Sequence, residues 1–307
     1  MPTVSVVIPT YNCAEFLETA IESVLGQTYQ DLEIIVIDDG STDNTQDIAS
    51  RYAERIIYCR QENMGLPGAR NRGIQSSQGK YIAFLDADDS WHARKLEKQI
   101  PILENDPSIG LVCSDFSMVE GDCVTAGSFL AMCPLARDGY VFDEIIQENF
   151  ILPSSTVITR SCLSDVGLFD EEQRRTEDRE LWLRICYRWK IAIVRDCLVT
   201  KRNRPGNLTS DSIVAAPYRI RLFEKTLRTF PNIPSKSQKL IRNELSVNFF
   251  DLGYDYFSKF MTREAREFLW RSLNFKWTNG KAAACLVASC LPGPVIRLLR
   301  RVRLTFG

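Results

Sequence analysis

Short apolar runs alternate with amphipathic stretches along the first 89 residues. Runs rich in β-branched and aliphatic residues predict buried strands at positions 4–9, 33–39, 56–59 and 81–85. Helical spacing of apolar residues and helix-start signals predict helices at positions 15–27, about 43–54, and 65 to about 79. Because strands and helices alternate, we expect right-handed crossovers. The pattern therefore predicts an α/β fold with a mostly parallel, Rossmann-like sheet flanked by helices.

Two of the predicted strands end in acidic residues. Asp38 and Asp39 close one strand, and Asp86, Asp88 and Asp89 follow another. Neighbouring parallel strands share one sheet edge, so these carboxylates should line one crevice. Oxygen ligands with no His or Cys nearby in sequence suit Mg²⁺ or Mn²⁺ better than Zn²⁺. The alternative is an acidic turn that closes an ordinary strand.

The middle of the chain has a less regular pattern. It predicts helices at 91–104, 142–150 and 161–166, strands at 109–116 and 154–159, and a strand pair or one bent strand at 190–200. The segment from 117 to about 139 alternates irregularly and is expected to form a loop or an edge hairpin. Because loops on a rigid scaffold carry most variation in binding, we expect acceptor specificity to reside there.

From position 217 onward the pattern predicts helices alone, at 218–228, 237–260, 263–273 and 281–291. Residues 282–292 are apolar nearly all round, and four arginines interrupt the apolar residues of 295–304. This stretch is typical of an anchor that lies on a membrane surface. The alternative is a helix packed on the catalytic domain with a solvated arginine face. No apolar run reaches the roughly 18 to 20 residues of a spanning helix.

Composition excludes several classes of protein. The formal net charge of −1 gives no reason to expect a nucleic-acid partner. The ten cysteines form no C-x-x-C pair, and no signal peptide precedes the first strand, so we expect reduced thiols in a cytoplasmic protein. If residues 282–304 bind a membrane, the protein would be peripheral at its inner face. The single histidine, His92, excludes an H-E-x-x-H zinc site.

Two common nucleotide-binding motifs are missing. No G-x-G-x-x-G occurs, which argues against a dinucleotide-dependent oxidoreductase. Gly79 and Lys80 suggest a P-loop, but Tyr81 replaces the required Ser or Thr and a strand follows where a helix is needed.

Five segments resemble, in order, the signatures of family 2 glycosyltransferases: residues 4–12 (VSVVIPTYN), 38–43 (DDGSTD), 63–65 (NMG), 69–71 (ARN) and 86–89 (DADD). The resemblance implies a GT-A fold that acts on nucleotide-activated sugars. We therefore expect a GT-A catalytic domain at 1–212, with a nucleotide-sugar half at about 1–116 and an acceptor half at about 117–212. The helical pattern of the remaining chain predicts a separate C-terminal region at 213–307.

The resemblance implies roles for individual residues. Tyr11 would stack on the nucleobase, Pro9 would shape the same wall, and Asp39 would accept a hydrogen bond from a base N–H. Arg70 would lie near the base or the phosphates. Structural alternatives remain for three of these: core packing for Tyr11, capping of the following helix for Asp39, and a solvated helix position for Arg70.

The acids of the DADD segment would have different roles. The resemblance implies that Asp86 contacts the ribose and that Asp88 holds the metal on the diphosphate. Many relatives also carry a His just before Pro-Gly-Asn, where this chain has Arg204. A guanidinium has no lone pair to give a metal, so Arg204 would instead pair with the diphosphate.

Thr176, Glu177 and Asp178 precede apolar residues at helical spacing. This places the two acids in a first helical turn, where the helix dipole favours anions. The acids followed by Leu-Trp-Leu-Arg resemble the catalytic acid motif of the family, which implies that Asp178 is the general base. A purely structural cap is the alternative.

The sequence thus predicts an inverting glycosyltransferase that uses Mg²⁺ or Mn²⁺. Its donor would be a nucleotide-sugar, a UDP-sugar by family habit, and its acceptor a polysaccharide or lipid-linked hydroxyl. A catalytically silent nucleotide-sugar-binding protein is the second hypothesis, supported only by Arg204. A nucleotidyltransferase is the third, but the chain lacks an N-terminal glycine-rich phosphate loop.

Overall fold

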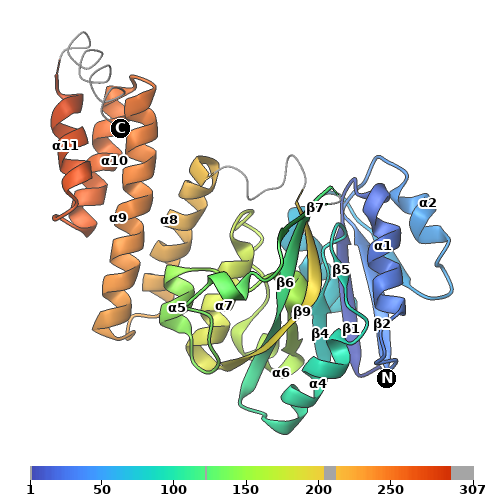
Figure 1. Cartoon of the computed structure of the whole chain (residues 1–307). Coiled ribbons are helices and arrows are strands. Elements are labelled where there is room, and N and C mark those ends of the chain that lie inside the picture. Colours follow the sequence, from blue (N-terminus) through green and yellow to red (C-terminus); the bar gives the residue numbers. More distant parts are fainter. Residues whose placement is uncertain (1, 122, 204–211, 292–307) are drawn as a thin grey trace. The chain divides into compact units, whose positions relative to one another are not determined.

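The computed structural model describes residues 2–121, 123–203 and 212–291. The chain divides into two compact units, Met1–Asn207 and Leu208–Gly307. The first unit is built around one sheet with the strand order β3-β2-β1-β4-β8-β6-β9-β5, to which β7 adds beside β6. The second unit is helical in its described part (Figure 1).

Half of the sheet is parallel. Its strands are β1 (Val4–Thr10), β2 (Leu32–Asp38), β3 (Ile57–Arg60) and β4 (Tyr81–Phe84). Every residue of β1 is buried, as expected for a β-branched run in the centre of a sheet. The register pairs Thr10 with Asp38, so β1 and β2 end together at the carboxyl edge.

The other half of the sheet is mixed. Its strands are β5 (Ser90–Trp91), β6 (Ile109–Glu120), β7 (Cys123–Ala126), β8 (Val157–Thr159) and β9 (Lys190–Asn203). β8 pairs antiparallel with both β4 and β6, whereas β6 and β9 run parallel as two long neighbours (Figure 1). The sheet is therefore mostly parallel, as the alternation of strands and helices predicts.

Seven α-helices accompany this sheet in the described part of the first unit: α1 (Ala14–Leu25), α2 (Thr45–Ser50), α3 (Gly65–Ser76), α4 (Lys95–Asn105), α5 (Phe142–Gln147), α6 (Arg160–Val166) and α7 (Glu177–Arg188). Helix α3 lies very close to β1. A Cβ atom on Gly73 would lie 2.2 Å from Val7 Cγ1, so only glycine permits this approach.

Several predicted boundaries are wrong. Trp91 does not begin a helix, because Ser90–Trp91 form β5 against β9 and the helix begins at Lys95. The indole N–H of Trp91 donates to the carbonyl oxygen of Ser154 at 2.7 Å, a tertiary contact that overrides helical spacing. The strand predicted at 154–159 begins only at Val157, after the 3-10 turn Pro153–Ser155.

Two open alternatives are resolved. The segment 190–200 is one strand, and register shifts against β6 between Ser114 and Phe116 accommodate its bend. The segment after β6 begins as an edge hairpin, because β7 pairs antiparallel with the end of β6.

The second unit contains α8 (Ser212–Thr229), α9 (Ser235–Ser258), α10 (Thr262–Phe275) and α11 (Gly280–Ser289). Pro217 lies inside α8, so this helix begins earlier than predicted. Helix α9 approaches α10 at Gly253, where a Cβ atom would lie 2.8 Å from Leu269 Cγ. Among the described helices, none is long and apolar enough to cross a membrane.

Lys95 is a fully buried lysine in the sheet unit. Its Nζ lies 3.9 Å from the centre of the Trp91 ring and donates to the carbonyl oxygen of Thr156 at 3.4 Å. Burial lowers the pKa of Lys95 well below its usual range, because the charged form loses its hydration. The core therefore favours the neutral amine.

We predict that Lys95→Met raises the melting temperature at pH 7 by about 2 °C or more, because folding no longer has to remove a proton from this side chain. In the unchanged protein, the folded form binds fewer protons than the unfolded form, so stability rises as the pH approaches the ordinary lysine pKa. Thermal unfolding over a pH series measures both effects. Lys98→Met, on the same helix, is the control, and identical pH profiles for the two variants would contradict the prediction.

Candidate functional site

The acidic edge forms where β1, β2 and β4 end. The N–H of Asp39 donates to the carbonyl oxygen of Thr10 at 2.9 Å, so Tyr11 and Asp39 begin adjacent loops. The Tyr11 side chain is 49% exposed, which excludes core packing for it. Pro9 is buried within β1, directly before this edge. The exposed ring of Tyr11 and the buried Pro9 thus lie together at the carboxyl end of β1.

Asp39 holds the loop between β3 and α3. Its Oδ1 accepts hydrogen bonds from Gln61 Nε2 at 2.8 Å and from the Met64 N–H at 2.9 Å, and its Oδ2 accepts from the Gly65 N–H at 2.8 Å. The carboxylate therefore binds the amino end of α3, where the helix dipole favours an anion. The expected alternative, capping of the following helix α2, is wrong.

Arg70 joins two distant parts of the chain. Only 1% of it is exposed, so the predicted alternative of a solvated helix position is wrong. Its two terminal nitrogens donate at 2.7 Å to Asp86 Oδ1 and to Glu177 Oε1. Asp86, at the end of β4, is thereby fixed to the start of α7. Glu177 was expected only in the first turn of that helix, and its pairing with Arg70 has no local sequence signal because they are 107 residues apart.

Three carboxylates compete for this one guanidinium. Burial, together with the charges of Asp178 and Asp86, raises the pKa of Glu177 to about 7 against the opposing effect of Arg70. A single guanidinium thus faces three neighbouring carboxylates, one of which is buried beside it.

Asp178 lies half-buried in the first turn of α7. Its Oδ1 accepts from the Arg179 N–H at 2.7 Å, which is a capping contact, and its Oδ2 accepts from Asn149 Nδ2 at 2.9 Å. Capping and a chemical role are thus compatible, because the second oxygen is oriented by another side chain. Asn149 follows α5 and escaped prediction, since nothing in its local sequence marks it.

Asp89 anchors the end of the DADD segment. Its Oδ2 accepts from Ser154 Oγ at 2.6 Å, and its Oδ1 accepts from the Arg202 N–H at 3.1 Å. Burial, followed by the charges of Asp86 and Asp88, raises the pKa of Asp89 to about 8. This buried carboxyl group ties the acidic loop to β9.

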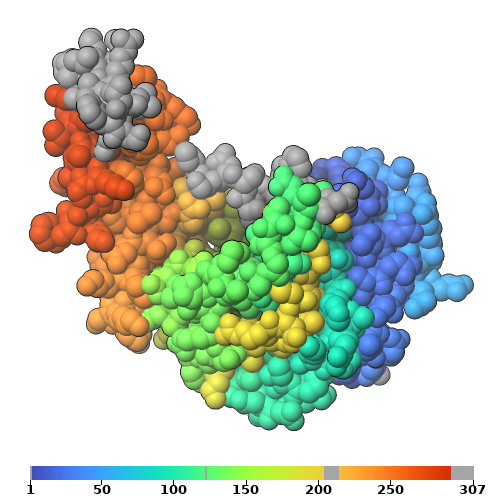
Figure 2. Space-filling model, in the orientation of Figure 1, coloured from blue at the N-terminus to red at the C-terminus, as the bar shows by residue number. Residues whose placement is uncertain are grey.

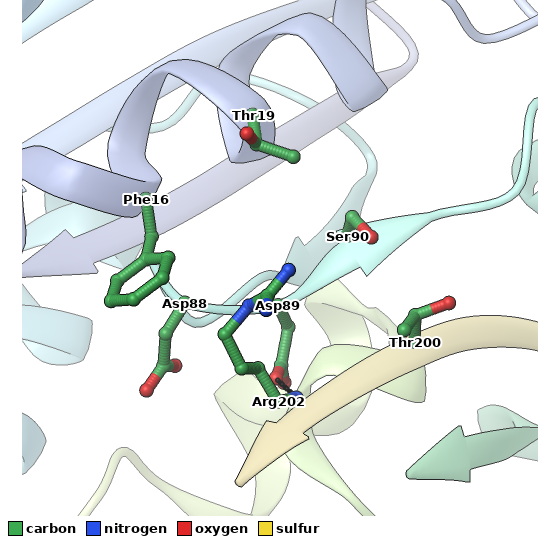
Figure 3. Close-up of a pocket in the computed structure, with 7 residues that line it drawn as sticks. All are labelled: Phe16, Thr19, Asp88, Asp89, Ser90, Thr200 and Arg202. Atoms are coloured by element: carbon green, nitrogen blue, oxygen red, sulfur yellow. Dashed lines mark hydrogen bonds between the residues drawn. The ribbon is translucent and has the colours of Figure 1, made fainter. Parts of the chain in front are cut away.

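Asp88 lies beside this anchor and lines a small hollow (Figure 3). The hollow is lined by Phe16, Thr19, Asp88, Asp89, Ser90, Thr200 and Arg202. The Arg202 guanidinium lies over the Phe16 ring, 5.2 Å from its centre, and its Nη1 donates to the carbonyl oxygen of Gly121 at 3.3 Å. Arg202 was missed, although it belongs to the same basic run as Arg204. Arg204 itself lies outside the described residues.

The residues present fit a divalent cation that shares its ligands with a substrate. In the described residues, no group of three or more His, Cys, Asp or Glu side chains is arranged to hold a metal alone. Asp86 and Asp88 are half-buried at the edge of the sheet. Mg²⁺ commonly takes one or two carboxylates and completes its shell with phosphate and water oxygens.

Sequence comparisons find related proteins. A family model described as glycosyl transferase family 2 matches residues 5–124. RP339 of Rickettsia prowazekii, an uncharacterised glycosyltransferase, is 33% identical over 219 residues, which are 69% of this chain and 67% of that protein. TuaG of Bacillus subtilis, a glycosyltransferase assigned to teichuronic acid biosynthesis, is 31% identical over 70% of this chain and 84% of TuaG.

A third relative has a more specific name. WfaP of Escherichia coli is a UDP-Glc:alpha-D-GlcNAc-diphosphoundecaprenol beta-1,3-glucosyltransferase. It is 35% identical over 166 residues, which are 50% of this chain and 65% of WfaP.

Solved structures confirm the predicted GT-A fold. TarS 1–349 of S. aureus in complex with UDP-GlcNAc has a TM-score of 0.64 and 17% identity, covering 94% of this chain and 90% of that chain. The mannosyltransferase PcManGT of Pyrobaculum calidifontis in complex with GDP-Man and Mn²⁺ has a TM-score of 0.60 and 20% identity. The match covers 95% of this chain and 81% of PcManGT.

We predict that Arg70→Met lowers the free energy of unfolding by about 3–5 kcal/mol, because Asp86 and Glu177 lose a buried cation. Arg72→Met, at an exposed position on the same helix, should change it by less than about 0.5 kcal/mol. Urea-induced unfolding of both variants measures the difference. Equal stability of the two variants would show that the buried bridge contributes nothing.

Proposed function

Because the chain belongs to glycosyltransferase family 2, we propose that it transfers a sugar, with inversion, from a nucleoside-diphosphate sugar to a hydroxyl of a polysaccharide or lipid-linked acceptor. The observation that carries this proposal is the Arg70 bridge, which holds Asp86 and the start of α7 on one cation. This bridge keeps Asp86, the acid expected to contact the donor, near Asp178, the acid expected to act on the acceptor. Donor binding belongs to residues 1–116, and acceptor binding to about 117–212.

We assign the nucleobase to the edge beside Tyr11, Pro9 and Asp39. A carboxylate has about four acceptor positions, and three of those of Asp39 are used within the chain. One position is left for a base N–H. A UDP-sugar is the proposed donor, in keeping with the name of WfaP and the UDP-GlcNAc bound to TarS.

We assign the diphosphate to the loop of Asp86 and Asp88. Mg²⁺ or Mn²⁺ held by Asp88 would neutralise the charge that develops on the departing diphosphate. Asp86 contacts the ribose and is kept in position by Arg70. The Mn²⁺ in the PcManGT complex supports the choice of cation. Arg204 remains a proposed partner of the diphosphate.

Asp178 is the proposed general base. Its carboxylate takes the proton from the acceptor hydroxyl while that oxygen attacks the anomeric carbon. The bond from that carbon to the diphosphate breaks on the opposite face, so one displacement inverts the centre. The hydrogen bond from Asn149 to Oδ2 orients the carboxylate. Asn149 is therefore a positioning residue, because it acts on the acceptor hydroxyl only through the Asp178 carboxylate.

We predict that Asp178→Asn lowers turnover by about 10²–10⁴-fold while the affinity for the nucleotide stays within about threefold, because the amide cannot accept the proton. Turnover is measured as sugar transfer and affinity as UDP binding by calorimetry. Asp47→Asn, at an exposed position on α2, is the control. Full activity of Asp178→Asn would remove the base assignment.

We predict that a panel of nucleotide-sugars scored for nucleoside-diphosphate release yields one preferred donor, and that release requires Mg²⁺ or Mn²⁺. Chelation should abolish release, and added metal should restore it. Asp88→Ala should reduce metal-dependent release at least about a hundredfold, because the diphosphate loses its bound cation. Release that persists unchanged in the chelator argues against a metal on Asp88, and pyrophosphate as the product would indicate nucleotidyl transfer.

A further inference from the structure

Helix α11 exposes an apolar side. It packs against α10 and α9 (Figure 1), and its buried residues are Ala282, Cys285 and Ser289. Residues exposed to solvent recur at every third position on the opposite side: Lys281, Ala284, Val287 and Cys290. In Figure 2 the dark orange atoms of α11 lie at the surface of the helical unit. Only one of these outward residues is charged.

An aromatic residue precedes this side of the helix. Trp277, in the turn between α10 and α11, is 84% exposed, and Val287 is 68% exposed. Leu291, just beyond the helix, is also exposed. We name Trp277, Lys281, Ala284, Val287 and Leu291 the α11 face. A solvent-facing helix normally carries charged and polar residues on its outer side, so this composition indicates a surface that a partner covers.

The surrounding charge selects the kind of partner. Residues 268–307 contain no Asp or Glu. Their cationic residues are Arg271, Lys276, Lys281, Arg297, Arg300, Arg301 and Arg303. Such a segment attracts an anionic surface. A symmetric dimer through the same face would oppose identical cations, which disfavours a second copy of the chain as the partner.

We infer that the α11 face docks on the surface of an anionic phospholipid bilayer. Trp277 would lie at the headgroup level. There the apolar part of the indole ring contacts the acyl chains and its N–H finds a hydrogen-bond acceptor. Val287 and Leu291 would enter the boundary with the acyl chains, while Lys276 and Lys281 contact lipid phosphates. This inference rests on the proposed lipid-linked acceptor, because docking would bring the catalytic unit to a substrate that is confined to the membrane.

Co-sedimentation of the full chain with vesicles tests the inference. The chain should sediment with vesicles of phosphatidylcholine and phosphatidylglycerol, and much less with phosphatidylcholine alone or at high salt. Trp277→Ser and Val287→Ser should each weaken binding to the anionic vesicles by about fivefold or more. The matched control is Val124→Ser, because Val124 is 67% exposed on β7 in the other unit. That variant should bind as the unchanged chain does.

Three results would overturn the inference. These are failure of the unchanged chain to bind anionic vesicles, equal binding by Val287→Ser and Val124→Ser, and a self-associated chain that Val287→Ser converts to monomer. Metal-dependent nucleoside-diphosphate release is measured in solution on the same samples. If the unchanged chain releases nucleoside diphosphate but does not bind vesicles, only the docking is refuted. If the unchanged chain releases no nucleoside diphosphate, the proposed function is refuted.

Discussion

The buried guanidinium of Arg70 is the constraint on which the rest of the site depends. A cation without water requires anionic partners, and Arg70 takes one from the end of β4 and one from the start of α7. Those partners come from parts of the fold that are remote in sequence. The position of α7 on the sheet is therefore set by charge as well as by apolar packing. Asp178 follows Glu177 directly, so the same bridge determines where its carboxylate lies.

The acids of the sheet edge fall into two groups that differ in burial. Asp39 and Asp89 are buried, and each uses its oxygens to fasten a loop: the start of α3 for Asp39, and β9 for Asp89. Asp86, Asp88 and Asp178 are only half-buried. The buried acids connect loops through hydrogen bonds, whereas Asp86 and Asp178 combine contacts within the chain with partial access to solvent.

Most of the fold could be predicted from the sequence, because buried parallel strands are continuous β-branched runs and the helices between them keep a regular period. Trp91 was misassigned, since a hydrogen bond to Ser154 determines its conformation and no local pattern encodes that bond. The candidate acids were all visible as motifs. The partners of these acids were not: Glu177 for Arg70 and Asn149 for Asp178 come together only in the folded chain.

The three hydrogen bonds to Asp39 have a thermodynamic consequence for ligand binding. They order the loop before α3 in the free protein, so the conformational entropy of that loop is lost during folding and not during association. A nucleotide that binds beside Asp39 would contact an already ordered loop. Its binding would then cost less conformational entropy, and its affinity would be higher. A carboxylate whose acceptor positions are largely occupied within the chain can therefore strengthen binding by keeping its surroundings rigid, even where it makes a single contact with the base.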